Sequence, residues 1–334
     1  MGITLKDLAQ ICNCSVTSVS RALKDSDTIS KELRIKVQST AKELGYIPNL
    51  LASSMRKGYT KTIAMILQNL RNPFNSLLAK YVEEYASALG YSVIIMTTGE
   101  DKNKEYNCVI GAIQKGVDGI LYLPTQIDTK SLEILKSNDF PFILYGRIFK
   151  DIESDYVIAN DAQGAYIAVD HLIQKGHKNI LFLNTFMNIY SASERYDGYK
   201  KALEDNNLPF IAQNVRNISM EIGETQKIVE QIFSHTNNYT AVFCFCDLMA
   251  FEVYYSLAQL GYRIPEDIAI ASNDDIHNDI ILPIKLTSSN VSRKRLAQAS
   301  VDMLLDKISE KGTPAFKQYK HIVIDPTLTI GQTT

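Results

Sequence analysis

The sequence predicts a small all-α head followed by a larger α/β body with two lobes, each built on a doubly wound parallel sheet. Two observations support this fold class. Apolar residues recur at helical spacing in short segments over the first 45 residues, whereas from residue 62 onward apolar runs of strand length alternate with amphipathic segments. The alternation begins afresh after residue 161, which indicates a second α/β lobe.

Three short helices are expected in the head. Thr4 can cap the first helix, with an acid at the third helical position, and Ser15 and Ser30 occupy the equivalent places before the second and third helices. Asn13 tolerates the left-handed conformation that a tight turn needs, and Gly45 is a natural end for the third helix. A helix, a tight turn, a second helix and a supporting third helix describe a helix-turn-helix domain.

The strand-like runs of the body fall into two sets. The first set is 62–68, 92–98, 119–124 and 140–146. The run 155–161 follows, and the alternation then starts again with 179–184, 241–247 and 267–275. Parallel strands end at one edge of their sheet, and ligands bind beyond that edge. We therefore expect a ligand cleft between the lobes, lined by the residues that follow the strands: Gln68, Asn69, Asp161, Cys246, Asp247, Asp274 and Asp275.

Charge is distributed unevenly along the chain. Residues 1–60 contain nine basic and five acidic residues, whereas the remaining residues contain 26 basic and 32 acidic ones. A basic head on an acidic body is typical of DNA-binding proteins, although ordinary surface variation can produce the same asymmetry.

Composition narrows the class of protein further. The amino-terminal stretch is amphipathic and charged, unlike a signal peptide, and no run reaches the roughly 18 apolar residues of a membrane span. Five cysteines in an irregular pattern favour reduced thiols, so we expect a cytoplasmic protein with no membrane association. The two C-x-C pairs have no histidine at ligand spacing, and Cys244 and Cys246 are interpreted as small buried hydrophobic residues. No metal and no cofactor is expected.

Several motifs carry a resemblance that extends over nearly the whole chain. In the head these are SVTSVSRAL (15–23), ELGYIPN (43–49) and LASSMR (51–56). In the body they are NPF (72–74), GVDGIL (116–121), the segment 161–177, ERYDGY (194–199) and IPEDIAIASNDD (264–275). With this order and spacing, the chain resembles the lactose/galactose repressor (LacI/GalR) family of bacterial transcription regulators.

The resemblance implies a domain organisation and a mechanism. It implies a helix-turn-helix domain (1–48), a hinge helix or linker (49–60) and a ligand-binding and dimerisation body (61–334) similar to periplasmic sugar-binding proteins. Lobe one is expected at about 61–160 and 291–320, and lobe two at about 161–290 and 321–334. The family acts on near-palindromic operator DNA as a homodimer or as a dimer of dimers. An effector in the cleft, here expected to be a sugar or sugar phosphate, controls operator affinity as an inducer or as a corepressor.

Other functions are weighed against this one. A regulator of the same architecture that answers to a purine or to a protein corepressor is the main alternative. A sugar-binding protein of a transporter would need a signal peptide and no DNA-binding head. An enzyme is not expected, because the chain has no nucleophile elbow, phosphate-binding loop or metal box, and the adjacent carboxylates of Asp274 and Asp275 tend to diverge.

The second helix of the head supplies the expected DNA contacts. Family positions that enter the major groove correspond to Val16, Thr17 and Arg21, which suit a thymine methyl, either base type, and guanine or phosphate, respectively. The alternative places Val16 in the core and leaves Arg21 as a solvated charge. Ser15 and Ser18 suit phosphate contact or capping better than base reading.

The hinge supplies a second set of expected DNA contacts. Met55 occupies the place of the family's apolar wedge in the minor groove, and its alternative role is packing between two hinge helices. Ala52 is small enough for close approach of paired hinges, and Arg56 and Lys57 are expected at phosphates.

Arg195 and Asp274 are the principal candidates for ligand binding. In the family the corresponding arginine and acid bind ligand hydroxyl groups, which suits a guanidinium fork and a carboxylate. The alternatives are a salt bridge from Arg195 to Glu194 or Asp197, and a capping role for Asp274. Further candidates, among which Phe74 can stack on a sugar and Asp161 can instead cap a helix, are Asn69, Phe74, Tyr145, Arg147, Asp161 and Asp247. Ser272 and Asn273 replace the family's usual glycine and aromatic residue beside the cleft.

Overall fold

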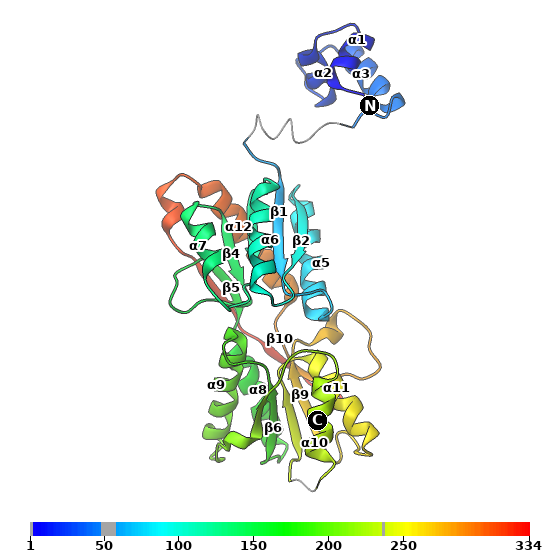
Figure 1. The fold of residues 1–334 in the computed structure, drawn as a ribbon. Helices are drawn as coiled ribbons and strands as arrows, with labels where there is room; N and C mark the ends of the chain where they lie inside the picture. The colour runs from blue at the N-terminus through cyan, green and yellow to red at the C-terminus, as the bar shows by residue number, and fades with distance from the viewer. Residues whose placement is uncertain (1–2, 48–57, 236–237) are drawn as a thin grey trace. The chain divides into compact units, whose positions relative to one another are not determined.

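The computed structural model describes residues 3–47, 58–235 and 238–334 and divides the chain into two compact units, Met1–Thr60 and Lys61–Thr334. Each unit is described by itself (Figure 1). The hinge residues Ala52, Met55, Arg56 and Lys57 lie outside the described residues.

The head consists of α1 (Leu5–Ile11), α2 (Val16–Leu23) and α3 (Lys31–Glu43). Each helix begins at the residue expected from the sequence. Thr4 and Asp7 form a reciprocal capping box, and the hydroxyls of Ser15 and Ser30 accept from Ser18 N and Leu33 N. Capping of this kind satisfies backbone amides that have no partner within the helix. The inward faces of the helices form a small core of Leu8, Ala9, Cys12, Val19, Ala22, Val37 and Ala41.

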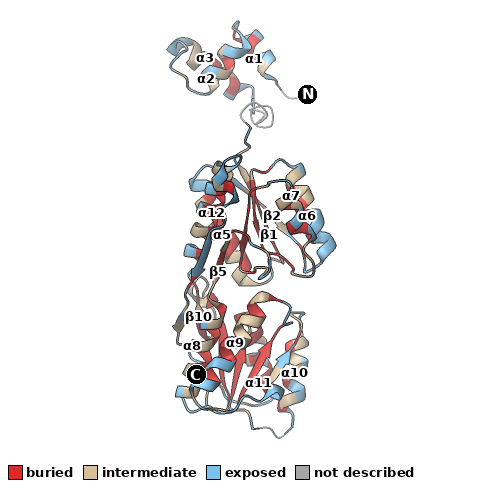
Figure 2. Cartoon of the chain, turned by 90° about the vertical axis from the view of Figure 1, so that its left-hand side faces the viewer, coloured by how far each residue is buried: buried red, intermediate tan, exposed pale blue. Residues whose placement is uncertain are grey.

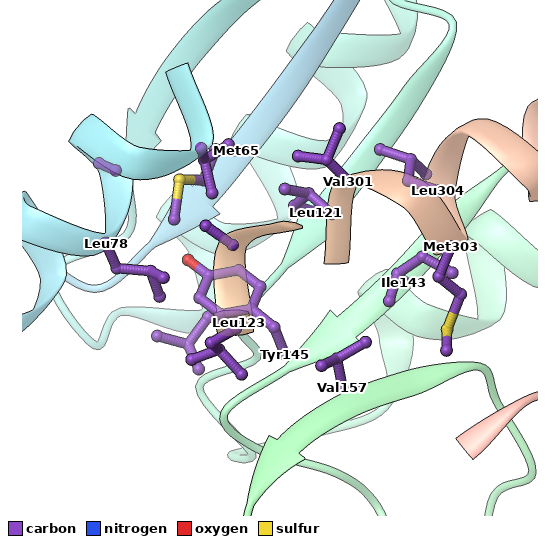
Figure 3. Close-up of a cluster of buried hydrophobic side chains, with 14 of the residues drawn as sticks. Met65, Leu78, Leu121, Leu123, Ile143, Tyr145, Val157, Val301, Met303 and Leu304 are labelled. Atoms are coloured by element: carbon purple, nitrogen blue, oxygen red, sulfur yellow. The ribbon is translucent and has the colours of Figure 1, made fainter. Parts of the chain in front are cut away.

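The first lobe is a six-stranded parallel sheet in the order β11-β5-β4-β3-β1-β2. Its strands are β1 (Thr62–Leu67), β2 (Ser92–Thr97), β3 (Gly119–Tyr122), β4 (Phe142–Tyr145), β5 (Tyr156–Ala159) and β11 (His321–Ile324). Its helices are α5 (Pro73–Ala88), α6 (Lys102–Gln114), α7 (Lys130–Ser137) and α12 (Arg293–Glu310). Apolar residues of α5 and α12 pack on the sheet, among them Leu78 and Val301 against Met65 and Leu121 (Figure 3).

The second lobe repeats the plan with the order β12-β10-β9-β8-β6-β7. Its strands are β6 (Ile180–Asn184), β7 (Val215–Asn217), β8 (Ala241–Cys244), β9 (Ala269–Asn273), β10 (Thr287–Asn290) and β12 (Thr327–Thr329). Its longer helices are α8 (Asp161–Gln174), α9 (Tyr190–Asp205), α10 (Glu224–Phe233) and α11 (Asp247–Gln259). All of its strand pairs are parallel except that of β10 with β12. In both lobes the central strands are buried and the outer helix faces are exposed (Figure 2).

In the part of the body that the structure describes, the chain crosses between the lobes three times, and the last crossing differs from the expected one. Crossings follow β5 and β10, as expected, but the third lies at residues 325–326 rather than near 320. The reason is that β11 pairs with β5 along its whole length, from His321 opposite Tyr156 to Ile324 opposite Ala159. The strand therefore belongs to lobe one, and only the residues after it belong to lobe two.

None of the helices within the described ranges is long and apolar enough to cross a membrane.

Candidate ligand cleft and DNA-binding surface

Two adjoining cavities lie where the carboxyl ends of the strands of both lobes meet. We call them the inner cavity, of about 100 Å³, and the outer cavity, of about 420 Å³. They share Gln68, Asn72, Asn75 and Arg147 from lobe one and Phe245 from lobe two. Arg195, Asp161, Asp274, Phe74 and Tyr145 line the inner cavity, and the outer cavity adds Asn69, Glu100, Phe186 and Met220. The cavities therefore form one cleft with walls from both lobes.

Arg195 reaches the inner cavity from α9. Its Nε donates to Asp161 Oδ1 at 2.9 Å, its Nη1 donates to the carbonyl of Phe245, and its guanidinium lies 4.4 Å from the centre of the Phe245 ring. The two helices that carry Arg195 and Asp161 can approach because of Gly198, one turn further along α9. A Cβ on Gly198 would lie 2.1 Å from the carbonyl oxygen of Ala162.

The partners of Arg195 differ from those of the alternative interpretation. Its salt bridges are with Asp161 and Asp274, at 2.8 and 3.9 Å, rather than with Glu194 or Asp197. Glu194 instead pairs with Lys150 of the first lobe at 2.7 Å. The guanidinium thus lies at the cavity wall and not on the surface of α9.

Asp274 is the acid nearest to Arg195 at the end of β9. Asp274 is 8% exposed, and its backbone φ of 111° is rarely adopted by a residue other than glycine. Burial raises the pKa of its carboxyl group to about 8; Arg195 opposes this rise and the nearby Asp247 adds to it. Burial likewise raises the pKa of Asp161, against the opposing effect of Arg195. The inner cavity thus places a guanidinium beside two carboxyl groups whose charged forms are disfavoured.

Asp247 is placed differently from the ligand contact that the sequence suggested. It is fully buried, lines neither cavity, and accepts from Ser272 Oγ at 2.5 Å, Ser288 Oγ at 2.6 Å and Ile276 N at 2.9 Å. Its carboxylate therefore holds the loop after β9 in place. Ser272, which replaces the family's usual glycine, is one of its three donors.

The other candidates lie at the cleft in distinct roles. Arg147 forms a double hydrogen bond with Glu100 at 2.7 and 3.1 Å and a third with the carbonyl of Pro124. The hydroxyl of Tyr145 donates to Ile66 O, and Asn69 accepts from the backbone amides of residues 71 and 72. These three residues shape the wall. Phe74, at the start of α5, presents an aromatic side chain to the inner cavity.

Sequence reasoning missed part of the outer cavity. Ser219, Met220 and Glu221 line it from the loop after β7, a strand of three residues that was not predicted. Phe186 follows β6, and the rule that ligands bind beyond strand ends would have found it if applied to residues 179–184.

The second helix of the head presents the expected residues to solvent. Val16, Thr17 and Arg21 are exposed, whereas Val19 on the opposite face is fully buried. The alternative that placed Val16 in the core is therefore wrong. Ser15 caps the helix, and its hydroxyl lies 2.9 Å from that of Ser18.

Comparison with known proteins assigns both units of the chain to the same family. Residues 4–49 match the family described as bacterial regulatory proteins, lacI family, and residues 60–324 match periplasmic binding proteins and sugar binding domain of LacI family. The HTH-type transcriptional repressor PurR of Haemophilus influenzae strain PittEE is 31% identical over 330 residues, covering 98% of this chain and 97% of that protein. PurR of Aliivibrio fischeri strain MJ11 is 29% identical over 311 residues, with 92% of each chain covered.

Solved structures agree on the fold. A lac repressor dimer bound to operator and the anti-inducer ONPF has a TM-score of 0.85 at 22% identity, covering 100% of this chain and 99% of that one. The complex of the regulator CelR with cellobiose has a TM-score of 0.74 at 23% identity, covering 99% and 100%.

A DNA-binding head and a two-lobed body with a cleft between its sheets define a ligand-controlled transcription regulator. The chain belongs to the LacI family of bacterial regulatory proteins. It is a DNA-binding transcriptional repressor rather than an enzyme, which confirms the predicted family, fold class and role in transcription.

Proposed function

We propose that a carbohydrate bound in the cleft controls the repressor's affinity for its operator. The observation that carries the proposal is the pair formed by Arg195 and Asp274, whose guanidinium nitrogen and carboxyl oxygen lie 3.9 Å apart at the inner cavity. A guanidinium donates and a carboxyl oxygen accepts, so together they match neighbouring hydroxyl groups, each of which can do both. Phe74 and Phe245 add apolar surface for the face of a sugar ring.

The amide side chains of the first lobe support the same class of ligand. Gln68, Asn72 and Asn75 line both cavities, and each amide offers donors and an acceptor to a polar ligand. Among the similar structures, one is described with cellobiose and another, from Enterococcus faecium, with ribose. Those names describe the related proteins and supply the starting compounds for a test.

A purine is the second candidate, and one observation favours it. A carboxyl group whose pKa is about 8 carries a proton at neutral pH and can donate and accept at once. Asp274 in that state matches the paired donor and acceptor edge of a purine base as well as it matches a diol.

A thermal-shift screen of the full-length protein separates these two candidates. Ribose, cellobiose, their phosphates and the common purine bases are tested first, and each compound that raises the melting temperature is titrated into an operator-binding assay. We expect a sugar to raise the melting temperature and to change operator affinity. If only purine bases do both, the carbohydrate assignment is wrong.

We further propose that Thr17 and Arg21 read bases of the operator and that Val16 contacts a thymine methyl group. Their exposure on α2 supports this proposal. Thr17→Ala should alter operator preference, whereas Lys57→Ala should weaken binding to every sequence and reduce its salt dependence. Equal, sequence-independent losses in both variants would show that Thr17 reads no base.

The assembly that we propose is a homodimer on near-palindromic DNA in the cytoplasm. The operator-bound relative described as a dimer supports it. Sedimentation of the full-length protein, alone and with operator, measures the oligomeric state and distinguishes a dimer from a tetramer.

A further inference from the structure

The turn after β9 has a backbone conformation that needs external support. Asp274 has φ 111° and Asp275 has φ 45°, and both residues are buried. Positive φ values cost free energy in residues other than glycine and persist where surrounding contacts impose them. The turn places the Asp274 carboxyl group at the inner cavity, so what imposes the turn also positions this group.

Part of the support comes from the other lobe. Arg293 is the first residue of α12, which packs on the sheet and helices of lobe one. Its Nη1 donates to the carbonyl of Asp274, and its Nη2 donates to the carbonyl of Asp275 at 2.7 Å. One guanidinium therefore binds both carbonyls of a turn that belongs to lobe two.

A second contact from lobe one reinforces the first. The Nε of Arg293 donates to Asp279 Oδ2 at 2.6 Å, and the hydroxyl of Tyr81 on α5 donates to Asp279 Oδ1. Asp279 follows the turn in lobe two, so its carboxylate is held between α12 and α5. The Arg293 side chain is 2% exposed and lines neither the inner nor the outer cavity.

We propose that Arg293 is a positioning residue of the cleft. From lobe one it fixes the turn that carries Asp274. The position of the Asp274 carboxyl group therefore depends on the relative orientation of the two lobes. The inference rests on the proposed role of Asp274 in effector binding. By linkage, a ligand that prefers one position of Asp274 also prefers one arrangement of the lobes.

Hydrogen exchange of the full-length protein, measured without any effector, tests whether Arg293 stabilises the turn. The amides of Asp274, Asp275 and Ile276 donate to Ser289 O, Ser288 Oγ and Asp247 Oδ2. In Arg293→Gln these amides should exchange at least about tenfold faster, the effect of losing one charged hydrogen bond. Arg263→Gln is the matched control, because it removes an exposed arginine of lobe two that pairs with an aspartate.

A fluorescent reporter tests whether Arg293 keeps the two lobes joined at the cleft. The chain contains no tryptophan, and Met220 is half-buried, lines the outer cavity and has its carbonyl bound by Arg71 of lobe one, so Met220→Trp gives a single reporter at the cleft. Acrylamide quenching of this tryptophan should rise toward the value of free tryptophan amide when Arg293→Gln is added, and should stay unchanged when Arg263→Gln is added. Unchanged quenching and unchanged exchange in the Arg293 variant would overturn the proposal.

Arg293→Lys separates positioning from space filling. A lysine keeps the ion pair with Asp279, but its single terminal nitrogen does not reproduce the planar fork whose three nitrogens reach the two carbonyls and the carboxylate. We therefore expect parental quenching, because the lobes stay joined, and fast exchange at residues 274–276, because the turn is released. Identical behaviour of the Lys and Gln variants in both measurements would overturn the positioning role.

Tyr81→Phe keeps the test open if the Arg293 variants fail to fold. It removes only the hydroxyl that donates to Asp279. Quenching should rise less than in Arg293→Gln, and an unchanged value would count against the proposal that these contacts join the two lobes. These measurements use no ligand, so their failure is distinct from a failure of the carbohydrate assignment.

Discussion

Two arginines, Arg293 and Arg195, lie near Asp274, and they differ in how many of their hydrogen-bonding groups are already bound within the protein. Arg293 donates to two carbonyls of the turn and to Asp279, and its side chain is 2% exposed. Arg195 is 12% exposed, lines the inner cavity, and lies 3.9 Å from the Asp274 carboxyl group, beyond hydrogen-bond distance. We call the first set of contacts, Arg293, Asp279 and Tyr81, the closed cluster, and the second, Arg195, Asp161 and Asp274, the open cluster.

The difference between the clusters indicates that the boundary between the lobes both joins the lobes and offers a place for a ligand. In the closed cluster the acid accepts from both an arginine and a tyrosine, which makes it a joint between the lobes. In the open cluster the Asp274 carboxyl group faces a cavity with unused hydrogen-bonding capacity, and its raised pKa records the cost of burying its charge there. The open cluster is therefore suited to binding a ligand, and the closed cluster to holding the protein together.

The largest expected effect is a loss of stability in the closed cluster. Asp279→Asn leaves Arg293 buried without its charged partner, and breaking a buried ion pair costs about 3–5 kcal/mol. Urea unfolding of the full-length protein, followed by circular dichroism, measures the change. Asp267→Asn breaks the exposed pair with Arg263 and should have little effect. A loss no larger than that of this control would contradict the assignment of the closed cluster as a joint.

The next effect concerns ligand binding in the open cluster. Arg195→Ala should weaken binding of the compound identified by the thermal-shift screen by roughly 10–150-fold, since a charged hydrogen bond contributes about 1.5–3 kcal/mol. Typical coupling between sites is about 1–3 kcal/mol, so this loss is large enough to abolish the ligand response. Operator binding without ligand should stay close to that of the parent protein.

Arg263→Ala serves as the control for the loss of an arginine charge. If titration gives the same ligand affinity for Arg195→Ala as for the parent, then Arg195 has a structural role in its pair with Asp161 and no role in binding.

The open cluster could be predicted from the sequence because its parts follow local rules. Asp161 and Asp274 come directly after strand-like runs, and Arg195 belongs to a recognisable motif. The caps at Thr4 and Ser15 were likewise predictable, because a cap depends on residues three positions apart.

The closed cluster could not be predicted in this way. Tyr81, Asp279 and Arg293 meet only because the chain crosses between the lobes, and no local pattern connects residues separated by 198 positions. Hydropathy also fails to predict which strands are buried near the points where the chain crosses between the lobes. Strand β10 has the polar sequence TSSN but is largely buried, whereas β11 has the apolar sequence HIVI but is largely exposed. The polar strand is tolerated because its hydroxyls bind buried partners, as Ser288 binds Asp247.

The smallest expected effect is a pH dependence that arises in the open cluster. The pKa of Asp274 is about 8 in the folded protein, against 3.8 for an ordinary aspartate. Between these values the folded state binds more protons than the unfolded state, so stability should fall as pH rises from about 4 to about 8. One proton limits the slope to about 1.4 kcal/mol per pH unit. Urea unfolding of the full-length protein at pH 6.5 and 7.5 measures the slope.

Asp274→Asn isolates the contribution of this carboxyl group to the slope. The pKa values of Asp161 and Asp247 are also raised by burial, and both groups are still present in the variant, so the difference between the two slopes is the measure of Asp274. The variant should lose up to about 1.4 kcal/mol of the change per pH unit. Asp267→Asn should lose none, because the pKa of Asp267 is lowered to about 2 and its titration ends well below this range. An identical slope for Asp274→Asn and the parent would mean that Arg195 holds the acid ionised, and the open cluster would then be a satisfied ion pair like the closed one.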